Sequence, residues 1–197
     1  FIVGEPVYPR PIIFNGEEGQ TYGYDKPAAF FIPVTAPPFL NDGQAKISVT
    51  TTWLACKKIC VVGEETKELM FSTHINEQGP LNKDKQLSRW AKALPRPLSD
   101  LEQGNVLVSG NTLVLSGATS MRPLFFIGIE NHLVRFEQTE RLAVDGNVFR
   151  LHIPLRIDAS QQGQDTATVE GLLLLGRGEF DASYTIHTEV KSGIRAQ

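Results

Sequence analysis

Short stretches of alternating apolar and polar residues dominate this chain, and residues typical of turns separate them. The clearest alternation covers residues 46–53, 149–157 and 182–190. A period of two is typical of a strand that buries one face and exposes the other. Shorter apolar runs occupy residues 28–35, 69–75, 106–108, 113–115, 124–129 and 172–175. The pattern therefore predicts about nine short strands.

Proline and glycine residues refine this strand prediction. Pro33 lies inside the first apolar run and has no backbone N–H to donate, which favours an edge strand or a bulge there. Gly110-Asn111 predicts the turn of a hairpin between two apolar runs. Asp145-Gly146 predicts a second turn, just before a long alternating strand.

One segment follows a different period. Its apolar positions recur at i, i+3, i+4 and i+7, the spacing of one helix face. They are Leu87, Trp90, Ala91 and Leu94. Pro95 follows directly and disfavours helical backbone in the residue before it. The pattern therefore predicts one helix over residues 84–94.

Many short strands with a single helix predict an all-β fold, and a β-sandwich is the architecture that such spacing favours. The helix divides the strands into two groups, so two β units joined by one short helix stay open as an alternative. We expect a β unit over residues 1–80 that carries both cysteines, a helical linker over 81–100, and a second group of strands over 101–190 packed with the first.

Composition narrows the class of protein. The chain has 197 residues, of which 41% are hydrophobic and 21% charged, as expected for a globular protein with a core. A net charge of −3 argues against a nucleic-acid partner, which would need a basic surface. No apolar run reaches the roughly 18 residues of a membrane-spanning helix, so we expect no direct membrane insertion. The chain begins at Phe1 without a signal-peptide pattern, and we expect it to be a fragment of a longer protein from which any secretion signal has been removed.

The only two cysteines, Cys56 and Cys60, have three residues between them. In a continuous strand their Cα atoms would lie about 13 Å apart, whereas a disulfide needs roughly 4.4–6.8 Å. If the cysteines pair, the chain must turn at residues 57–59. A helical turn would also bring them together, but the β-rich flanks favour a hairpin.

A redox role suits this spacing better than a structural one. Closing so short a loop stabilises the fold by only about 2 kcal/mol in the chain-entropy model. Lys57 and Lys58 lie between the sulfurs, and positive charge favours the reactive thiolate. Trp53 can supply an apolar wall. We therefore take Cys56 and Cys60 as candidate catalytic residues, with Trp53, Lys57 and Lys58 in supporting roles.

Three other interpretations stay open. The protein can be a β-sandwich binding module with a structural disulfide, and the two lysines can be ordinary solvated turn residues. Two thiolates can also bind Cu(I), as in a copper-tolerance domain. A closed zinc site needs four ligands, and the four histidines are scattered along the chain. We therefore expect no metal and no cofactor.

Several motifs resemble one family. The segment W-L-A-C-K-K-I-C at residues 53–60 is similar to the W-L-x-C-K-x-x-C segment of DsbD-like periplasmic domains, which include the N-terminal domains of DsbD and ScsB. Residues 23–34 resemble the G-Y-x and apolar-P-V stretch that precedes the cysteines in that family. Residues 90–97 resemble its A-x-x-x-L-P-x-P element, and the strand ending at residues 184–186 resembles its last strands.

The resemblance implies an immunoglobulin-like sandwich in the bacterial periplasm, exported as part of a membrane-anchored protein. It implies a protein-disulfide reductase domain that takes electrons from a membrane-embedded redox domain and passes them to periplasmic thioredoxin-like clients. It makes Cys56 and Cys60 the redox pair, with Cys60 as the attacking residue, and Tyr22 and Tyr24 a cap over them.

The resemblance also links the chain to cytochrome c biogenesis and copper tolerance. The spacing between the cysteines departs from one branch of the family. DsbD has five residues between its cysteines and this chain has three, which is closer to the ScsB-like branch. The clients of DsbD therefore do not transfer to this chain.

Overall fold

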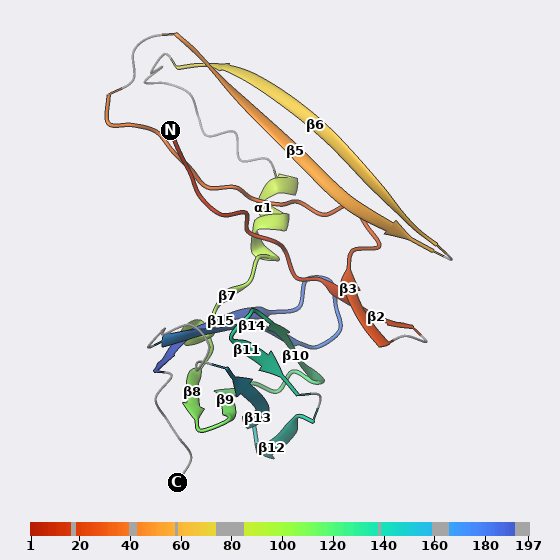
Figure 1. Cartoon of the computed structure of the whole chain (residues 1–197), viewed down its shortest axis with the longest axis vertical. Coiled ribbons are helices and arrows are strands. Elements are labelled where there is room, and N and C mark those ends of the chain that lie inside the picture. The colour runs from red at the N-terminus through yellow and green to blue at the C-terminus, as the bar shows by residue number, and fades with distance from the viewer. Residues whose placement is uncertain are drawn as a thin grey trace. The chain divides into compact units, whose positions relative to one another are not determined.

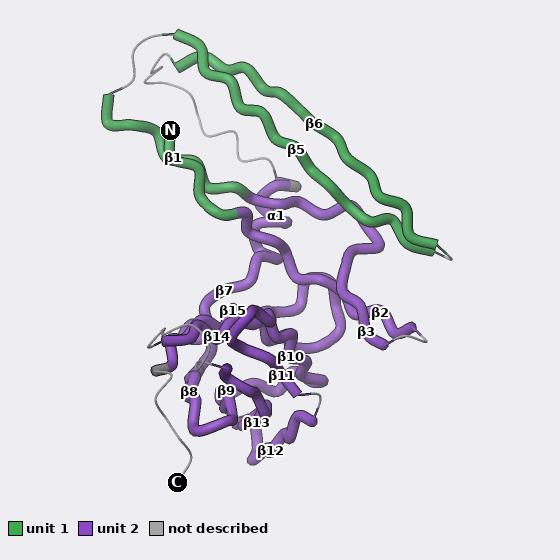
Figure 2. The backbone as a smooth tube through the Cα atoms, viewed as in Figure 1, with its two compact units in different colours: residues 1–5, 32–83 green, residues 6–31, 84–197 purple. Residues whose placement is uncertain are grey.

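The computed structural model of the chain divides it into two compact units (Figure 2). The first comprises Phe1–Glu5 and Ile32–Lys83, and the second comprises Pro6–Phe31 and Asp84–Gln197. Residues 6–31 thus group with the C-terminal strands instead of with their neighbours in sequence. The residues that the structure describes are 1–16, 19–39, 43–57, 59–73, 85–137, 139–158 and 166–191.

The first unit is built around one long hairpin (Figure 1). Strands β5 (Gln44–Cys56) and β6 (Cys60–Ser72) pair antiparallel along their whole length. A shorter pair joins β1 (Ile2–Val3) to β4 (Val34–Thr35). The predicted strand over residues 46–53 is confirmed inside β5. Of the predicted strand over residues 69–75, residues 69–72 end β6, and residues 74 and 75 lie outside the described residues.

The predicted strand over residues 28–35 is wrong over most of its length. Regular pairing there is limited to β4 and to one isolated bridge between Val7 and Phe31. Pro33 cannot donate to a ladder, and its carbonyl instead accepts a hydrogen bond from the Gly4 amide at 2.8 Å. The chain also passes from the second unit to the first between Phe31 and Ile32. The two halves of the segment 28–35 therefore pair with different neighbours.

The second unit contains two antiparallel sheets, apart from one parallel pair between β7 and β15. The first sheet is formed, in order, by β10 (Leu124–Ile129), β14 (Thr166–Leu175), β15 (Ser183–Lys191) and β7 (Arg96–Pro97). The second is formed by β11 (Val134–Phe136), β13 (Val148–Ile157), β9 (Thr112–Ala118) and β8 (Asn105–Ser109), with β12 (Arg141–Asp145) also paired to β13.

Alternating side chains of both sheets form one shared core. Phe149 and Leu151 of β13 are at most 2% exposed, as are Val169 of β14 and Ile186 of β15. In β13 and β15, the apolar positions that alternate in the sequence are therefore the positions whose side chains are buried. The predicted all-β, immunoglobulin-like sandwich is confirmed.

The turns and the helix also follow the predictions. Gly110 (φ +55°) closes the β8–β9 hairpin and Gly146 (φ +59°) closes β12–β13, both in the left-handed region that glycine adopts readily. Helix α1 (Lys85–Lys92) lies inside the predicted 84–94, and a short 3-10 turn, η1 (Leu98–Asp100), follows β7. No helix among the described residues is long and apolar enough to cross a membrane.

A hairpin of β2 (Ile12–Gly16) and β3 (Gly19–Gly23) also belongs to the second unit. The sequence pattern missed it because most of its residues are polar or glycine. Arg10, 5% exposed, fixes the chain just before this hairpin. Its guanidinium donates hydrogen bonds to the carbonyls of Leu175 at 2.8 Å and Gly176 at 2.7 Å, where β14 ends. Burial lowers the pKa of Arg10, and nearby Asp181 opposes that shift.

Candidate functional site

The tip of the β5–β6 hairpin carries the disulfide. Cys56 ends β5, Cys60 begins β6, and the two are register partners with Cα atoms 4.1 Å apart. Their sulfurs are bonded at 2.07 Å. The turn between them is tight, because the Lys57 amide donates to the Ile59 carbonyl at 3.2 Å. The prediction that the chain turns between the two cysteines is therefore confirmed, with one strand of the hairpin on either side.

The register assigns side chains to the two faces of this hairpin. Neighbouring residues along a strand point to opposite faces. Cys56 and its partner Cys60 therefore share a face with the next even-numbered pair, Leu54 and Val62. Trp53 belongs to the opposite face.

Leu54 and Val62 form an apolar platform beside the disulfide. They are direct register partners and lie one pair below Cys56 and Cys60 on the same face. Leu54 is 66% exposed and Val62 is 73% exposed. Sequence reasoning missed this platform, although the sequence contained the information. In a hairpin whose register is set by Cys56 and Cys60, the other even-numbered residues share the face of the sulfurs.

Trp53 braces the hairpin from the other face. Its register partner is Gly63, and a Cβ atom at position 63 would overlap the Trp53 ring. The indole thus packs directly over the glycine backbone, a contact that a larger residue would prevent. Beside the sulfurs, on their own face, the apolar neighbours are Leu54 and Val62.

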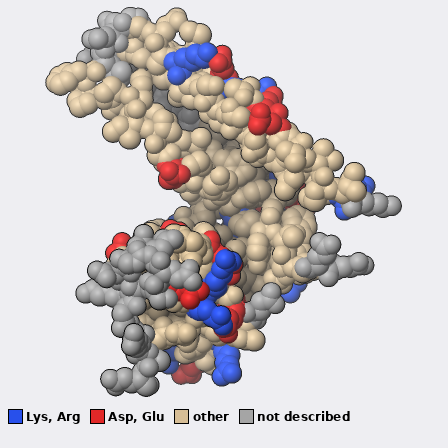
Figure 3. All heavy atoms as spheres, in the orientation of Figure 1, with Lys and Arg blue, Asp and Glu red and all other residues tan. Residues whose placement is uncertain are grey.

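Polar contacts line the stem of the hairpin on the disulfide face. The hydroxyl groups of Thr50 and Thr66 lie 2.8 Å apart in a hydrogen bond. Further down, Lys46 pairs with Glu68 at 2.6 Å between exposed side chains. Charged side chains gather along the stem, while the part toward the tip is largely uncharged except for Lys or Arg atoms at its very end (Figure 3). The site therefore combines the apolar platform near the tip with a polar stem.

One basic side chain adjoins the disulfide among the described residues. Lys57 follows Cys56 directly and is exposed. With Ala55, Ile59 and Val61 it lines an open hollow at the tip that also includes Cys56. Lys58 lies outside the described residues. Both cysteines are exposed, so a thiolate from solvent or from another protein can reach the bond.

The two tyrosines proposed as a cap lie in the second unit, while the cysteines lie in the first. Tyr24 donates a hydrogen bond to the Pro9 carbonyl at 2.7 Å and packs edge to face on Phe30 with ring centroids 5.6 Å apart. Burial raises the pKa of Tyr24 to about 12, and Tyr8 adds to the shift. Tyr22, 46% exposed, lines a hollow of the second unit. A shielding role for either residue stays a prediction.

The described residues contain no group of three or more His, Cys, Asp or Glu side chains that could hold a metal ion. Three of the four histidines lie in the second unit, and His74 lies outside the described residues.

The candidate site is thus an exposed disulfide at the tip of a hairpin, in a chain that also carries an immunoglobulin-like sandwich. Comparison with known proteins relates this part of the chain to one family. Residues 1–72 match the family model described as the N-terminal part of the thiol:disulfide interchange protein DsbD. Both cysteines and the whole β5–β6 hairpin fall inside the matched residues. The predicted resemblance is thus confirmed for this part of the chain.

The fold of the whole chain is that of a solved relative. The crystal structure of the N-terminal periplasmic domain of ScsB from Proteus mirabilis matches with a TM-score of 0.59 at 14% sequence identity. The match covers 98% of this chain and 74% of that one. At this identity the likeness establishes the fold. No match was found among curated proteins.

Proposed function

We propose that this chain is a periplasmic protein-disulfide reductase domain that relays reducing equivalents through Cys56 and Cys60. The observation that carries the proposal is the solvent-exposed disulfide at the tip of β5–β6, inside the residues that match the DsbD family model. Disulfides that are exposed to solvent belong to the labile and catalytic class more often than to the inert structural class.

The relay consists of two balanced exchanges. In the first, a thiolate of a membrane-embedded redox domain attacks the Cys56–Cys60 bond, and a mixed disulfide forms. The partner's second thiol resolves it, so the partner is oxidised and the domain leaves as a dithiol. In the second, Cys60 attacks the disulfide of a thioredoxin-like client, and Cys56 resolves the mixed disulfide. The client leaves with two thiols, and the domain regains its disulfide.

The neighbours of the disulfide have distinct roles in this proposal. Lys57 stabilises the thiolate of the reduced pair through its positive charge. Trp53 holds the hairpin straight by packing over Gly63. Leu54 and Val62 receive the apolar residues next to the partner's cysteine, because they share the face of the sulfurs. Tyr22 and Tyr24 shield the pair when no partner is bound.

A reduction potential tests the proposal most directly. The domain is equilibrated with glutathione buffers, and the fraction of oxidised Cys56–Cys60 is measured by mass after alkylation. We expect a potential above about −300 mV, in the range of exchangeable pairs. A far lower value would indicate an inert structural bond and a binding module.

The copper alternative has its own readout. The reduced domain is titrated with Cu(I) in the presence of a competing chelator. A tight one-to-one complex that the Cys56→Ser and Cys60→Ser double variant loses would favour copper handling over the relay. Exchange with an oxidised thioredoxin-like protein, together with no such complex, supports the relay.

A further inference from the structure

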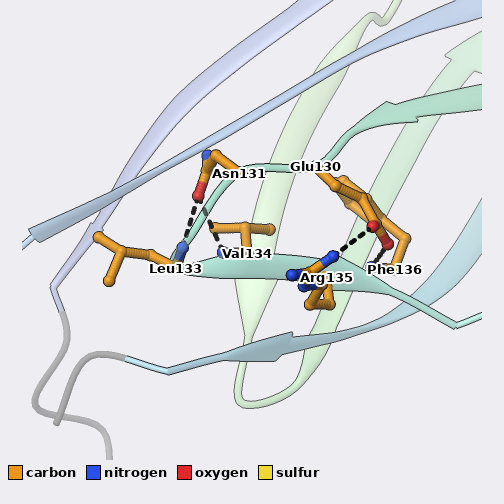
Figure 4. Close-up of polar contacts among 6 residues, drawn as sticks. All are labelled: Glu130, Asn131, Leu133, Val134, Arg135 and Phe136. Carbon is orange, nitrogen blue, oxygen red and sulfur yellow. Dashed lines mark hydrogen bonds and ion pairs between the residues drawn. The ribbon is translucent and has the colours of Figure 1, made fainter. Parts of the chain in front are cut away.

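The sandwich of the second unit has an open side, where β10 and β11 are the outermost strands of their sheets. Side chains fix the connection between these strands (Figure 4). Asn131 accepts hydrogen bonds from the backbone amides of Leu133 and Val134, both at 2.9 Å. Glu130 accepts one from the backbone amide of Phe136 at 3.1 Å. These bonds hold Phe136 in a defined place at the open side.

A hollow of about 620 Å³ lies against this side of the sandwich. Phe126 and Phe136, which meet edge to face with ring centroids 5.3 Å apart, form part of its wall. Core residue Ile153, 1% exposed, also lines it. Ile13 and Tyr22 contribute from the β2–β3 hairpin. The volume lies within the range of ligand sites, roughly 300–1,000 Å³.

The lining combines aromatic rings with acids. Its aromatic members are Tyr22, Phe125, Phe126 and Phe136. Glu137 and Glu140 supply two carboxyl groups, and none of the eleven lining residues is basic. Aromatic faces attract cations through their negative quadrupole, and carboxylates do so through their charge. The wall therefore favours a positive group attached to an apolar body.

The two acids differ in their surroundings. Glu137 has a cationic neighbour in Arg156, at 3.9 Å. Glu140 remains accessible to solvent, but nearby protein atoms desolvate it enough to raise its pKa. The pKa of Tyr22 is raised by burial and then by the charge of Glu140, and both residues line the hollow. A bound cation would offset the free-energy cost of the hydration that the Glu140 carboxylate loses.

We propose that this hollow binds an organic cation, an ammonium or guanidinium group on an apolar stem. The stem packs on the rings of Phe126 and Phe136, and the charge lies at Glu140 with Tyr22 beside it. The site belongs to the second unit, whereas the disulfide belongs to the first, so it adds a binding function to the proposed exchange chemistry.

The test compares two small probes of matched size and stem with a basic peptide. The whole chain is titrated with 2-phenylethylammonium, with its neutral counterpart 2-phenylethanol, and with a capped Gly-Lys-Gly peptide, by ligand-observed NMR. We expect saturable binding of at least one cation and at least tenfold weaker binding of the alcohol. Binding of the free amine alone points to a small-molecule ligand, and binding of the peptide points to a basic side chain of a protein. Either result supports the proposal.

Variants separate this site from general surface charge. Glu140→Gln keeps the shape and removes the charge, and we expect it to weaken cation binding about tenfold, as for loss of one charge-assisted contact. Glu189→Gln, exposed on β15 and outside the hollow, should leave binding unchanged. Tyr22→Ala, which removes part of the wall, should also weaken it. Equal binding of amine and alcohol, an unchanged affinity in Glu140→Gln, or no saturable cation binding would overturn the proposal.

Discussion

The sandwich of the second unit and the β5–β6 hairpin of the first bury their side chains to opposite extents. Leu151 and Leu155 of β13 are 2% and 1% exposed, whereas Leu54 and Val62 of the hairpin are 66% and 73% exposed. Both elements are antiparallel and both alternate. The difference is that β13 has a second sheet packed over its apolar face. Alternation alone therefore does not determine burial.

The two regions differ in what they contribute: the sandwich provides most of the folding stability, and the hairpin carries the reactive disulfide. Buried apolar area is the main source of folding free energy, and in this chain it is concentrated in the sandwich. The disulfide is on the exposed hairpin, where a partner thiol can reach it. A change in one region should therefore alter one property and leave the other largely intact.

The largest effect is expected at the cysteines. Either Cys56→Ser or Cys60→Ser should abolish complete exchange, because two sulfurs are needed to resolve the mixed disulfide. The two variants should still differ. Cys56→Ser retains the proposed attacking residue and should accumulate a mixed disulfide with an oxidised thioredoxin-like client, visible on non-reducing gels. Accumulation in Cys60→Ser instead would reverse the assignment of the two sulfurs.

A matched pair of leucines tests where the stability resides. Leu151→Ala in the sandwich should lower the free energy of unfolding by about 2–5 kcal/mol, as buried leucines do. The same substitution at exposed Leu54 should change it by less than about 0.5 kcal/mol. Urea denaturation followed by circular dichroism measures both. Similar losses at both positions would show that Leu54 is covered in solution.

The two faces of the hairpin form the next comparison. The double variant Leu54→Ser and Val62→Ser should slow exchange with a protein partner about tenfold, since lost apolar burial is worth about 1.5–3 kcal/mol per large side chain when complete. Leu69→Ser, on the opposite face, 62% exposed and outside the hollow at the tip, is the control and should change the rate little.

The rate of disulfide reduction by dithiothreitol should be unchanged in the platform double variant and in its control, because a small thiol does not need the apolar platform. A slower reaction with dithiothreitol would mean that the hairpin itself is disturbed. An equal loss in Leu69→Ser would contradict the assignment of the faces.

The smallest effect concerns Tyr24. Its pKa in the folded protein is raised to about 12, mainly by burial, from the usual tyrosine value of 10.0. The neutral phenol is therefore favoured in the folded state, and its contribution to stability is complete below pH 10. That contribution falls as the pH rises toward 12. Tyr24→Phe should flatten the pH dependence of the melting temperature in this window, and a profile unchanged from wild type would contradict a buried, neutral Tyr24.

Local patterns foresaw much of the fold. The alternation of β13 and β15, the helix before Pro95 and the turns at Gly110 and Gly146 each depend on a few neighbouring residues, so they could be predicted. The β2–β3 hairpin could not, because its stability comes from contacts with distant segments, of which Arg10 with the end of β14 is one. The bounds predicted for the domains stay a prediction.

The candidate site divides in the same way. The sequence by itself determined the cysteine pair and the need for a turn between its members, because a five-residue loop leaves the chain few conformations that join them. Only the tertiary structure decided which residues accompany the sulfurs. The register of β5 on β6 sets Leu54 and Val62 beside the disulfide and Trp53 on the other face. It likewise decided that residues 6–31 join the second unit, since such contacts link residues far apart in the chain and leave no local pattern.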